Sequence, residues 1–276
     1  MIDLNHLLPK MPAGATSRLV RFARRWMLPL SLLLGVLACQ LLTLLTRLPA
    51  FILPTPLLVA QRFVTALRDG SLLYHGAATL LEVALGLAIG SSLATVIGYL
   101  LARSRVLDAL LSPYLVASQA IPIVAIAPLL VIWFGPGMFS KVLICSLTVF
   151  FPVLVNTVVG LRAVPERLRA LMQSLHASRW QTLRYLEAPS ALPVFLGGLR
   201  VGATLSVIGA VVGELVGSDR GLGFLVNVAR GQFDTALVFV AVITLILMAL
   251  GMYGLVVLLE KRLLAWQTRE ETEEEW

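Results

Sequence analysis

Long apolar segments recur along this chain and constrain its fold more than any other feature. The hydrocarbon core of a bilayer is about 30 Å thick, so a spanning helix needs about 20 mostly apolar residues. Six segments meet this requirement, at residues 27–45, 77–101, about 111–134, 142–161, 194–216 and 235–259. Hydrophobic residues make up 58% of the chain and charged residues only 13%, a balance that soluble domains of this size do not show. The sequence therefore predicts an all-α membrane protein with six transmembrane helices.

Small residues and prolines indicate how these spans pack. Gly86, Gly90 and Gly98 lie in the second span and allow close helix contacts in lipid. The third span contains three prolines, which free backbone carbonyls that must face protein or water rather than lipid. These prolines are Pro113, Pro122 and Pro128.

Few ionisable side chains lie within the apolar segments. Glu82 is near the start of the second span, and we expect it at the membrane interface. Glu214, near the end of the fifth span, either lines a cavity or pairs with a neighbour near the headgroups. Neither arrangement forms a proton relay, and no catalytic pair is visible.

The polar stretch at residues 163–193, between the fourth and fifth spans, predicts two short helices joined by a turn near His176 and Ala177. The first helix has one apolar face, at helical spacing. That face consists of Leu168, Leu171, Met172 and Leu175. Ser178 followed by Gln181 has the form of a capping box for the second helix, and Pro189 is expected to end it. Such a hairpin could lie on lipid, dock on a partner or be a solvated loop.

Basic residues set the expected orientation. With six spans both termini share one side, and that side holds 16 of the 22 lysines and arginines. The positive-inside rule then makes both termini and the hairpin cytoplasmic. We expect a cytoplasmic tail at 1–26, a membrane domain at 27–265 and an acidic tail at 266–276. The net charge of +7 has the same origin, so no nucleic-acid partner is expected.

Catalytic and ligand-binding motifs are not found in the sequence. No phosphate-binding loop, zinc-protease motif or nucleophile elbow occurs, so the chain is not expected to be an enzyme. Its three histidines lack ligand spacing, which argues against a metal site. Cys39 and Cys145 lie inside apolar runs and are expected to be buried free thiols.

Three segments together resemble the permeases of bacterial ABC importers. Residues 171–189 are similar to the "EAA" loop of that family, particularly in the sulfonate, taurine and nitrate permeases and their thiamine-precursor and riboflavin relatives. Residues 121–135, with Pro122 and Pro128, resemble the third-span signature, and Gly221-Leu222-Gly223 resembles the outer-loop signature. The chain departs from the pattern at His176, where the family usually has glycine, and at residues 170–172, which replace "EAA".

The resemblance implies the type I importer permease fold and a role in coupling. Two permease chains would pair, with cytoplasmic ATPase subunits beneath and a periplasmic or lipid-anchored solute-binding protein above, all in the inner membrane. The chain itself would need no cofactor, because the partner ATPase uses the ATP. The implied ATPase contacts are Leu171, Met172, Leu175, His176, Ala177, Ser178, Arg179 and Trp180. Candidate pathway residues are Ser118, Gln119, Thr204, Ser206 and Glu214, although each polar group could instead make an interhelical hydrogen bond.

The substrate is the least constrained property. Residues 118–135 resemble the pyrimidine-precursor and riboflavin branch more than the sulfonate branch. An importer of alkanesulfonate, taurine or nitrate is the alternative. A self-sufficient secondary transporter is a different class, and it predicts buried charges and inverted repeats.

Overall fold

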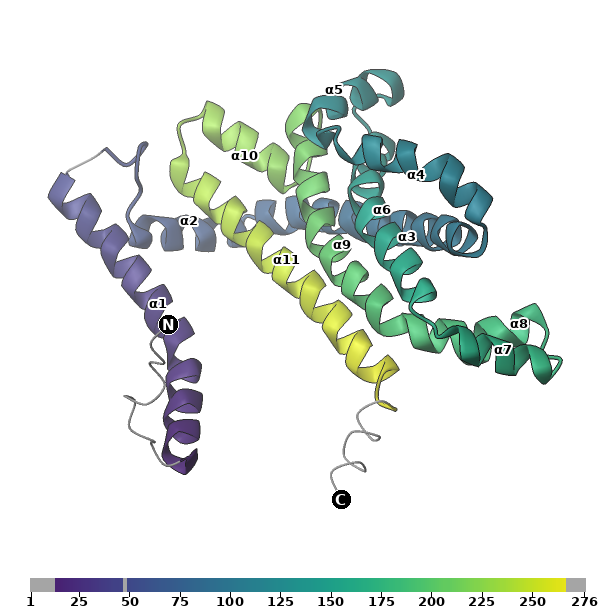
Figure 1. Ribbon diagram of the computed structural model, residues 1–276. Coiled ribbons are helices and arrows are strands. Elements are labelled where there is room, and N and C mark those ends of the chain that lie inside the picture. Colours follow the sequence, from purple (N-terminus) through teal and green to yellow (C-terminus); the bar gives the residue numbers. More distant parts are fainter. Residues whose placement is uncertain (1–12, 47–48, 267–276) are drawn as a thin grey trace, which may run out of the picture. The chain divides into compact units, whose positions relative to one another are not determined.

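The computed structural model describes residues 13–46 and 49–266, and these form helices and no strand (Figure 1). The chain divides into two compact units, Met1–Gln61 and Arg62–Trp276. The first unit contains α1 (Ala13–Thr46) and the start of α2 (Pro56–Arg68), a short helix. Residues 1–12 of the predicted N-terminal tail, and residues 267–276 of the acidic tail, lie outside the described residues.

The second unit holds the remaining helices. They are α3 (Ser71–Arg103), α4 (Arg105–Gln119), α5 (Ile123–Phe134), α6 (Met138–Arg162), α7 (Glu166–Ser174), α8 (Arg179–Thr182), α9 (Ala188–Val216), α10 (Leu222–Gly231) and α11 (Thr235–Leu263). A π-helical turn, Leu183–Glu187, joins α8 to α9.

Four of the predicted spans are confirmed by length and composition among the described residues. They correspond to α3, α6, the continuous helix Arg179–Val216 and α11. In the first unit the described apolar helix is Leu33–Thr46, which is shorter than a full span. The count of six spans therefore stays a prediction.

The third span differs from the expected single broken helix. It consists of α4 and α5, which meet at an angle of 96°. Only Pro122 marks the break, since Pro113 and Pro128 lie inside helices. A residue before proline is driven out of the helical region, and the helix therefore stops ahead of Ile121 and restarts after Pro122. The pair forms either a broken span or a re-entrant segment.

Helices α3, α6 and α9 pack closely along much of their length. Cys145 on α6 lies between two glycines: a Cβ on Gly86 would come within 2.2 Å of its Cβ, and a Cβ on Gly209 within 2.9 Å of its Cα. Any side chain larger than hydrogen would push the helices apart, so the glycines set the spacing of this core. Cys145 is buried and outside any disulfide, as predicted; Cys39 is also free but only half-buried.

Pro189 does not end the second helix of the hairpin, contrary to the sequence prediction. The helix continues from α8 through the π-helical turn into α9, with the proline in the first turn of α9. A proline inside a helix loses one backbone hydrogen bond and its ring crowds the carbonyl four residues earlier. The wider π-helical turn directly before Pro189 relieves this crowding, and the chain stays helical.

Candidate functional site

The polar hairpin forms as the sequence predicts. Helix α7 is followed by a turn and then by α8, at the end of the molecule where α6 ends and α9 begins (Figure 1). The predicted capping box is present: the Gln181 amide donates to Ser178 Oγ at 3.2 Å, and the Ser178 amide donates to Gln181 Oε1 at 2.7 Å. These reciprocal bonds fix the start of α8.

His176 occupies a left-handed conformation in the hairpin turn, with φ at +56°. Glycine adopts this region without strain, which is consistent with the glycine that the ABC permease pattern has at this position. The backbone thus makes a tight turn here with histidine at the left-handed position. The His176 ring nitrogen Nδ1 lies 3.1 Å from the Ser174 carbonyl oxygen, a local contact that accompanies the turn.

Glu187 anchors the hairpin to the spans. Its buried carboxylate accepts a hydrogen bond from Arg103 of α3 at 3.0 Å, and it lies 3.4 Å from Arg169 Nε of α7. Arg169 also donates to the Leu161 carbonyl at the end of α6, at 2.7 Å. Three helices and the π-helical turn therefore meet at one carboxylate. The sequence analysis did not single out Glu187, because its partners come from distant parts of the chain.

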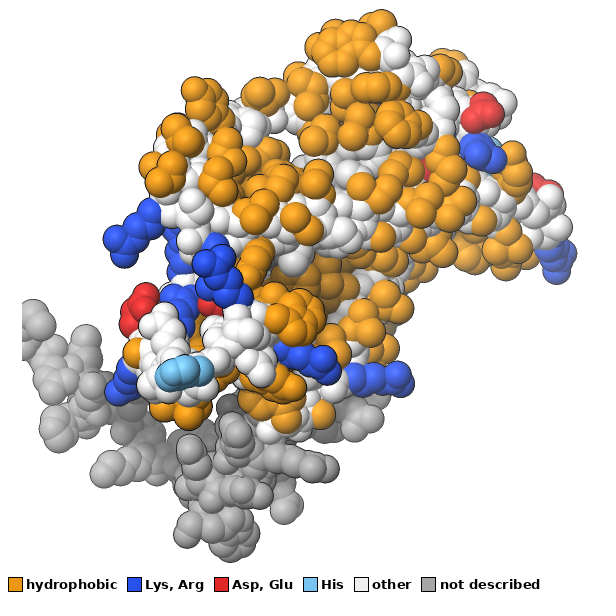
Figure 2. Space-filling model, turned by 90° about the vertical axis from the view of Figure 1, so that its right-hand side faces the viewer, with side chains coloured by type: hydrophobic (Ala, Val, Ile, Leu, Met, Phe, Trp, Pro, Cys, Tyr) orange, Lys and Arg blue, Asp and Glu red, His pale blue; other side chains and the backbone are white. Residues whose placement is uncertain are grey.

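The outer face of the hairpin exposes large apolar side chains. The exposed fractions are 54% for Leu171, 68% for Leu175 and 66% for Trp180. Figure 2 views this end of the molecule and shows hydrophobic and basic side chains side by side around a histidine. Of the other predicted contact residues, Met172 and Ala177 are half-buried, while His176, Ser178 and Arg179 are exposed. An apolar face in the longest polar segment is typical of a docking surface.

Two of the predicted pathway residues lie together. Ser118 and Gln119, at the end of α4, line a pocket of about 360 Å³ with Thr148 and Phe151 of α6. The pocket forms at the α4–α5 break, and its lining contains no charged side chain. Thr148 was not predicted, since a threonine in an apolar run carries no distinctive sequence signal.

The structure does not bring the other pathway candidates to that pocket. Thr204 and Ser206, on α9, donate to carbonyls of their own helix at 2.9 and 2.8 Å, and Ser206 is fully buried. Ser118 makes a similar bond to Leu115 at 2.9 Å. The hydroxyls of Ser118, Thr204 and Ser206 are therefore each hydrogen-bonded within their own helix. For the buried Ser206, this bond is enough to explain a polar side chain inside the protein.

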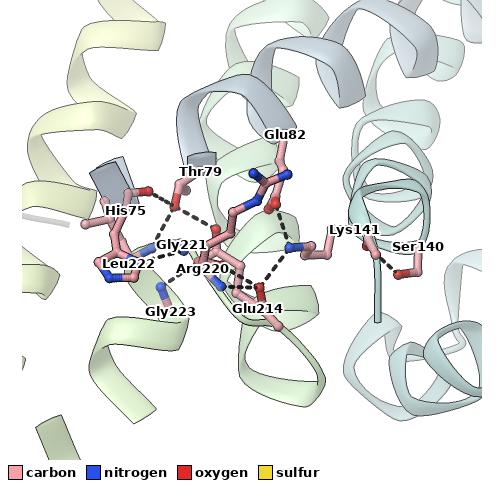
Figure 3. A network of polar contacts seen from close by, with 12 residues as sticks. His75, Thr79, Glu82, Ser140, Lys141, Glu214, Arg220, Gly221, Leu222 and Gly223 are labelled. Atoms are coloured by element: carbon pink, nitrogen blue, oxygen red, sulfur yellow. Dashed lines mark hydrogen bonds and ion pairs between the residues drawn. The ribbon is translucent and has the colours of Figure 1, made fainter. Parts of the chain in front are cut away.

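A buried ion pair occupies the opposite end of the spans from the hairpin. Lys141 Nζ on α6 lies 2.9 Å from Glu82 Oε1 on α3, and each side chain is only 1% exposed. Glu82 is thus buried in protein and paired, and its position at the depth of the membrane interface stays a prediction. Lys141 also donates to Ser218 Oγ at 2.8 Å, which links the pair to the loop after α9. Figure 3 shows the side chains of Lys141 and Glu82 pointing toward one another.

Glu214 fixes the loop that contains Gly221-Leu222-Gly223. Its carboxylate accepts from Thr79 Oγ1 at 2.6 Å and from the Gly223 amide at 2.5 Å (Figure 3). The Leu222 amide donates in turn to Thr79 Oγ1 at 2.8 Å. A Cβ on Gly221 would lie 2.1 Å from Glu214 Oε1, so this loop needs glycine to approach the carboxylate. The sequence left two arrangements open for Glu214, lining a cavity or pairing with a neighbour. The contacts in the structure are those of pairing with neighbours.

Lys141 is one of the six lysines and arginines outside the 16 that the sequence analysis placed on the cytoplasmic side, and its burial was not predicted. The signal was weak: a single lysine directly before an apolar run normally anchors a span at the interface. Here it lies in the first turn of α6 and is covered by α3 and the loop after α9.

The described helices are those of a multi-pass membrane protein, with four, or up to five, long and apolar enough to span a bilayer. A crystal structure described as an amino acid ABC transporter with histidines matches with a TM-score of 0.53 at 20% sequence identity, covering 74% of this chain and 96% of that one. This match shows the permease fold and nothing about substrate.

The chain belongs to the family described as the binding-protein-dependent transport system inner membrane component, whose model matches residues 86–265. It is 48% identical over 240 residues to a riboflavin transport system permease protein of Chloroflexus aurantiacus, covering 87% of this chain and 90% of that protein. It is 36% identical to a formylaminopyrimidine transport permease protein of Halalkalibacterium halodurans, covering 80% and 88%. Identity to the taurine transport system permease protein of Escherichia coli is 35%, covering 88% and 93%. The chain is therefore an ABC transporter permease.

Proposed function

We propose that this chain forms the substrate path of an importer and couples it, through the hairpin, to a separate cytoplasmic ATPase. The observation that carries the proposal is the set of exposed apolar side chains on a rigidly capped hairpin, with Leu171, Leu175 and Trp180 each more than half exposed. Burying one such side chain in a partner groove contributes about 2 kcal/mol. Glu187 and its arginines then connect the docked hairpin to α3, α6 and α9.

The proposed setting is the inner membrane, with both termini and the hairpin in the cytoplasm. The excess of arginine and lysine on that side supports this orientation. A second copy of the permease, a pair of ATPase subunits and a periplasmic or lipid-anchored solute-binding protein complete the complex. This chain hydrolyses nothing and needs no cofactor of its own in this proposal, since the ATPase consumes the ATP.

The proposed substrate is a small heteroaromatic solute such as riboflavin or a pyrimidine precursor. Two observations support this choice over a sulfonate or nitrate. The relative named for riboflavin transport is more similar to this chain than the relative named for taurine transport. The pocket at the α4–α5 break also offers hydroxyl and amide groups beside Phe151 and no cation. An uncharged polar lining beside an aromatic ring suits a flat, hydrogen-bonding solute, whereas an anion usually meets arginine or lysine.

Uptake into liposomes tests the substrate and the class together. The tagged permease is purified from native membranes with whatever ATPase accompanies it, and is reconstituted with ATP inside and the co-purified solute-binding protein outside. Radiolabelled riboflavin should accumulate only with ATP, and radiolabelled taurine should not. Accumulation of taurine alone would favour the sulfonate alternative. Riboflavin uptake without ATP or ATPase would instead indicate a secondary transporter.

A hairpin variant tests the coupling role. Leu175→Glu places a charge on the exposed apolar face, and we expect ATPase affinity to fall by about 30-fold, as for loss of about 2 kcal/mol. Ala170→Glu adds the same charge on α7 about 140° away around the helix axis and is the matched control. Equal ATPase binding by the two variants in a pulldown would contradict docking through this face.

A further inference from the structure

An apolar slot opens near the hairpin end of the spans. It encloses about 420 Å³ between α3, the end of α6 and the start of α9, and its lining is almost entirely apolar. Val96 and Leu100 on α3 border it and are 59% and 49% exposed, so the slot is accessible from the side of the helix bundle. Leu161 and Phe195 form part of its opposite wall.

A basic mouth adjoins this slot. A second pocket of about 610 Å³ shares Tyr99 and Leu100 with the slot and continues toward the hairpin. Its lining includes Arg103, Arg169 and Arg179 against a single carboxylate, Glu187. The apolar slot and the basic mouth are therefore continuous through two shared residues of α3.

The mouth keeps an excess of positive charge after its internal pairing. Glu187 is engaged by Arg103 at 3.0 Å and by Arg169 at 3.4 Å. Arg179 makes no ion pair or side-chain hydrogen bond with the part of the chain that the structure describes. Arg169 also lies 3.4 Å from Glu166, so two carboxylates face three guanidinium groups, and the remaining positive charge attracts an anion. Arginine is also the side chain best suited to bind a phosphate with two parallel hydrogen bonds.

We propose that the slot and mouth together bind one anionic phospholipid, with its phosphate at Arg103 and Arg179 and one acyl chain in the slot. The dimensions agree with this occupant. Thr95, which lines the slot, lies eight residues before Arg103 on the same helix, a rise of about 12 Å. That distance is close to the depth of one leaflet's hydrocarbon, about 15 Å. A free phosphate would use the mouth and leave the apolar slot unfilled.

The bound lipid joins a span to the hairpin. Arg103 is the last residue of α3, whereas Arg179 is the first residue of α8. A phosphate shared by the two would tie the motion of the hairpin to that of α3. The binding of lipid is independent of the proposed ATPase coupling; only its effect on transport rests on the proposed function.

Native mass spectrometry of the purified full-length chain tests the proposal. Detergent-solubilised protein is mixed with dioleoyl phosphatidylglycerol or with dioleoyl phosphatidylcholine, which differ in charge but share acyl chains. One phosphatidylglycerol per chain should remain bound at collision energies that remove phosphatidylcholine. Equal retention of the two lipids, or displacement of phosphatidylglycerol by millimolar inorganic phosphate, would overturn the assignment.

Two pairs of variants locate the site. Val96→Trp fills the slot from its exposed border, and Ile89→Trp, two turns earlier on the same exposed face of α3, is its control. Arg179→Gln removes a headgroup ligand, and Arg184→Gln removes an exposed hairpin arginine outside the mouth. Val96→Trp and Arg179→Gln should each lower phosphatidylglycerol affinity about tenfold, and the controls should not. Unchanged retention in both test variants would refute the site even if one of them were poorly folded.

Discussion

Removing the lysine of the buried ion pair should destabilise the protein severely. Lys141 and Glu82 are each 1% exposed and 2.9 Å apart, and Glu82 Oε2 has no hydrogen-bond partner among the described residues. Lys141→Met would leave the buried Glu82 carboxyl without its ion-pair partner, with Glu214 close by (Figure 3). Breaking a buried pair from one side costs about 3–5 kcal/mol, a large part of the 5–15 kcal/mol that typically stabilises a folded domain.

The same cost should disappear when both partners are removed. In the double variant Lys141→Met/Glu82→Leu the unpaired Glu82 carboxyl is gone, and Glu214 keeps its hydrogen bonds from Thr79 and the Gly223 amide. Replacing a whole buried pair by apolar groups is often neutral. We expect the double variant to recover most of the lost stability. The result would be a coupling energy of about 3 kcal/mol in a double-mutant cycle.

Unfolding in mixed micelles, followed by circular dichroism across a denaturant titration, measures these differences. Arg62→Met is the matched control, because it breaks an ion pair of 2.7 Å whose side chains are 31% and 27% exposed. Partly exposed pairs contribute about 1 kcal/mol or less. If Lys141→Met cost no more than Arg62→Met, the buried cluster would not carry the stability that its geometry implies.

Three smaller perturbations probe the turns. Gly221→Ala would place a Cβ 2.1 Å from Glu214 Oε1 at a φ of +114°. We expect the free energy of unfolding to fall by more than about 2 kcal/mol in the same denaturant titration. The control Gly231→Ala, which has open space around it, should change the free energy of unfolding little. His176→Gly removes a left-handed non-glycine residue and should stabilise the hairpin by about 1 kcal/mol or less, seen as slower hydrogen exchange at the α8 amides; faster exchange would contradict this. Ser178→Ala breaks the capping box at a cost of about 1 kcal/mol and should speed exchange at Gln181, whereas Ser174→Ala, which bonds only within α7, should not.

Features with a local cause could be predicted from the sequence. The capping box of Ser178 and Gln181 depends on residues three apart, so the pattern alone predicts its hydrogen bonds. The apolar lengths of α3, α6, α9 and α11 likewise follow from composition, because the bilayer fixes the length a helix needs. Gly86 was expected to permit close packing, and it lies against Cys145.

Features that depend on tertiary contacts were missed or misjudged. Lys141 and Glu82 are 59 positions apart, and their pairing arises only when α3 packs on α6. The prolines show the same limit. Each removes an amide donor, yet of the three in the predicted third span only Pro122 breaks a helix, and Pro189 lies within a continuous one. Whether a helix continues past a proline depends on how neighbouring turns adjust, as the π-helical turn before Pro189 does.

That π-helical turn has a mechanical consequence. Because the helix does not stop at Pro189, residues Arg179–Val216 form one continuous helix of 38 residues, about 57 Å long measured along its axis. Its base carries the hairpin, and near its tip Glu214 holds the loop of Gly221. A tilt of about 5° at the base would swing the tip by about 5 Å, more than enough to separate hydrogen-bonded partners. Under the proposed coupling, this helix would act as a lever arm that carries a motion of the hairpin to the loop of Gly221.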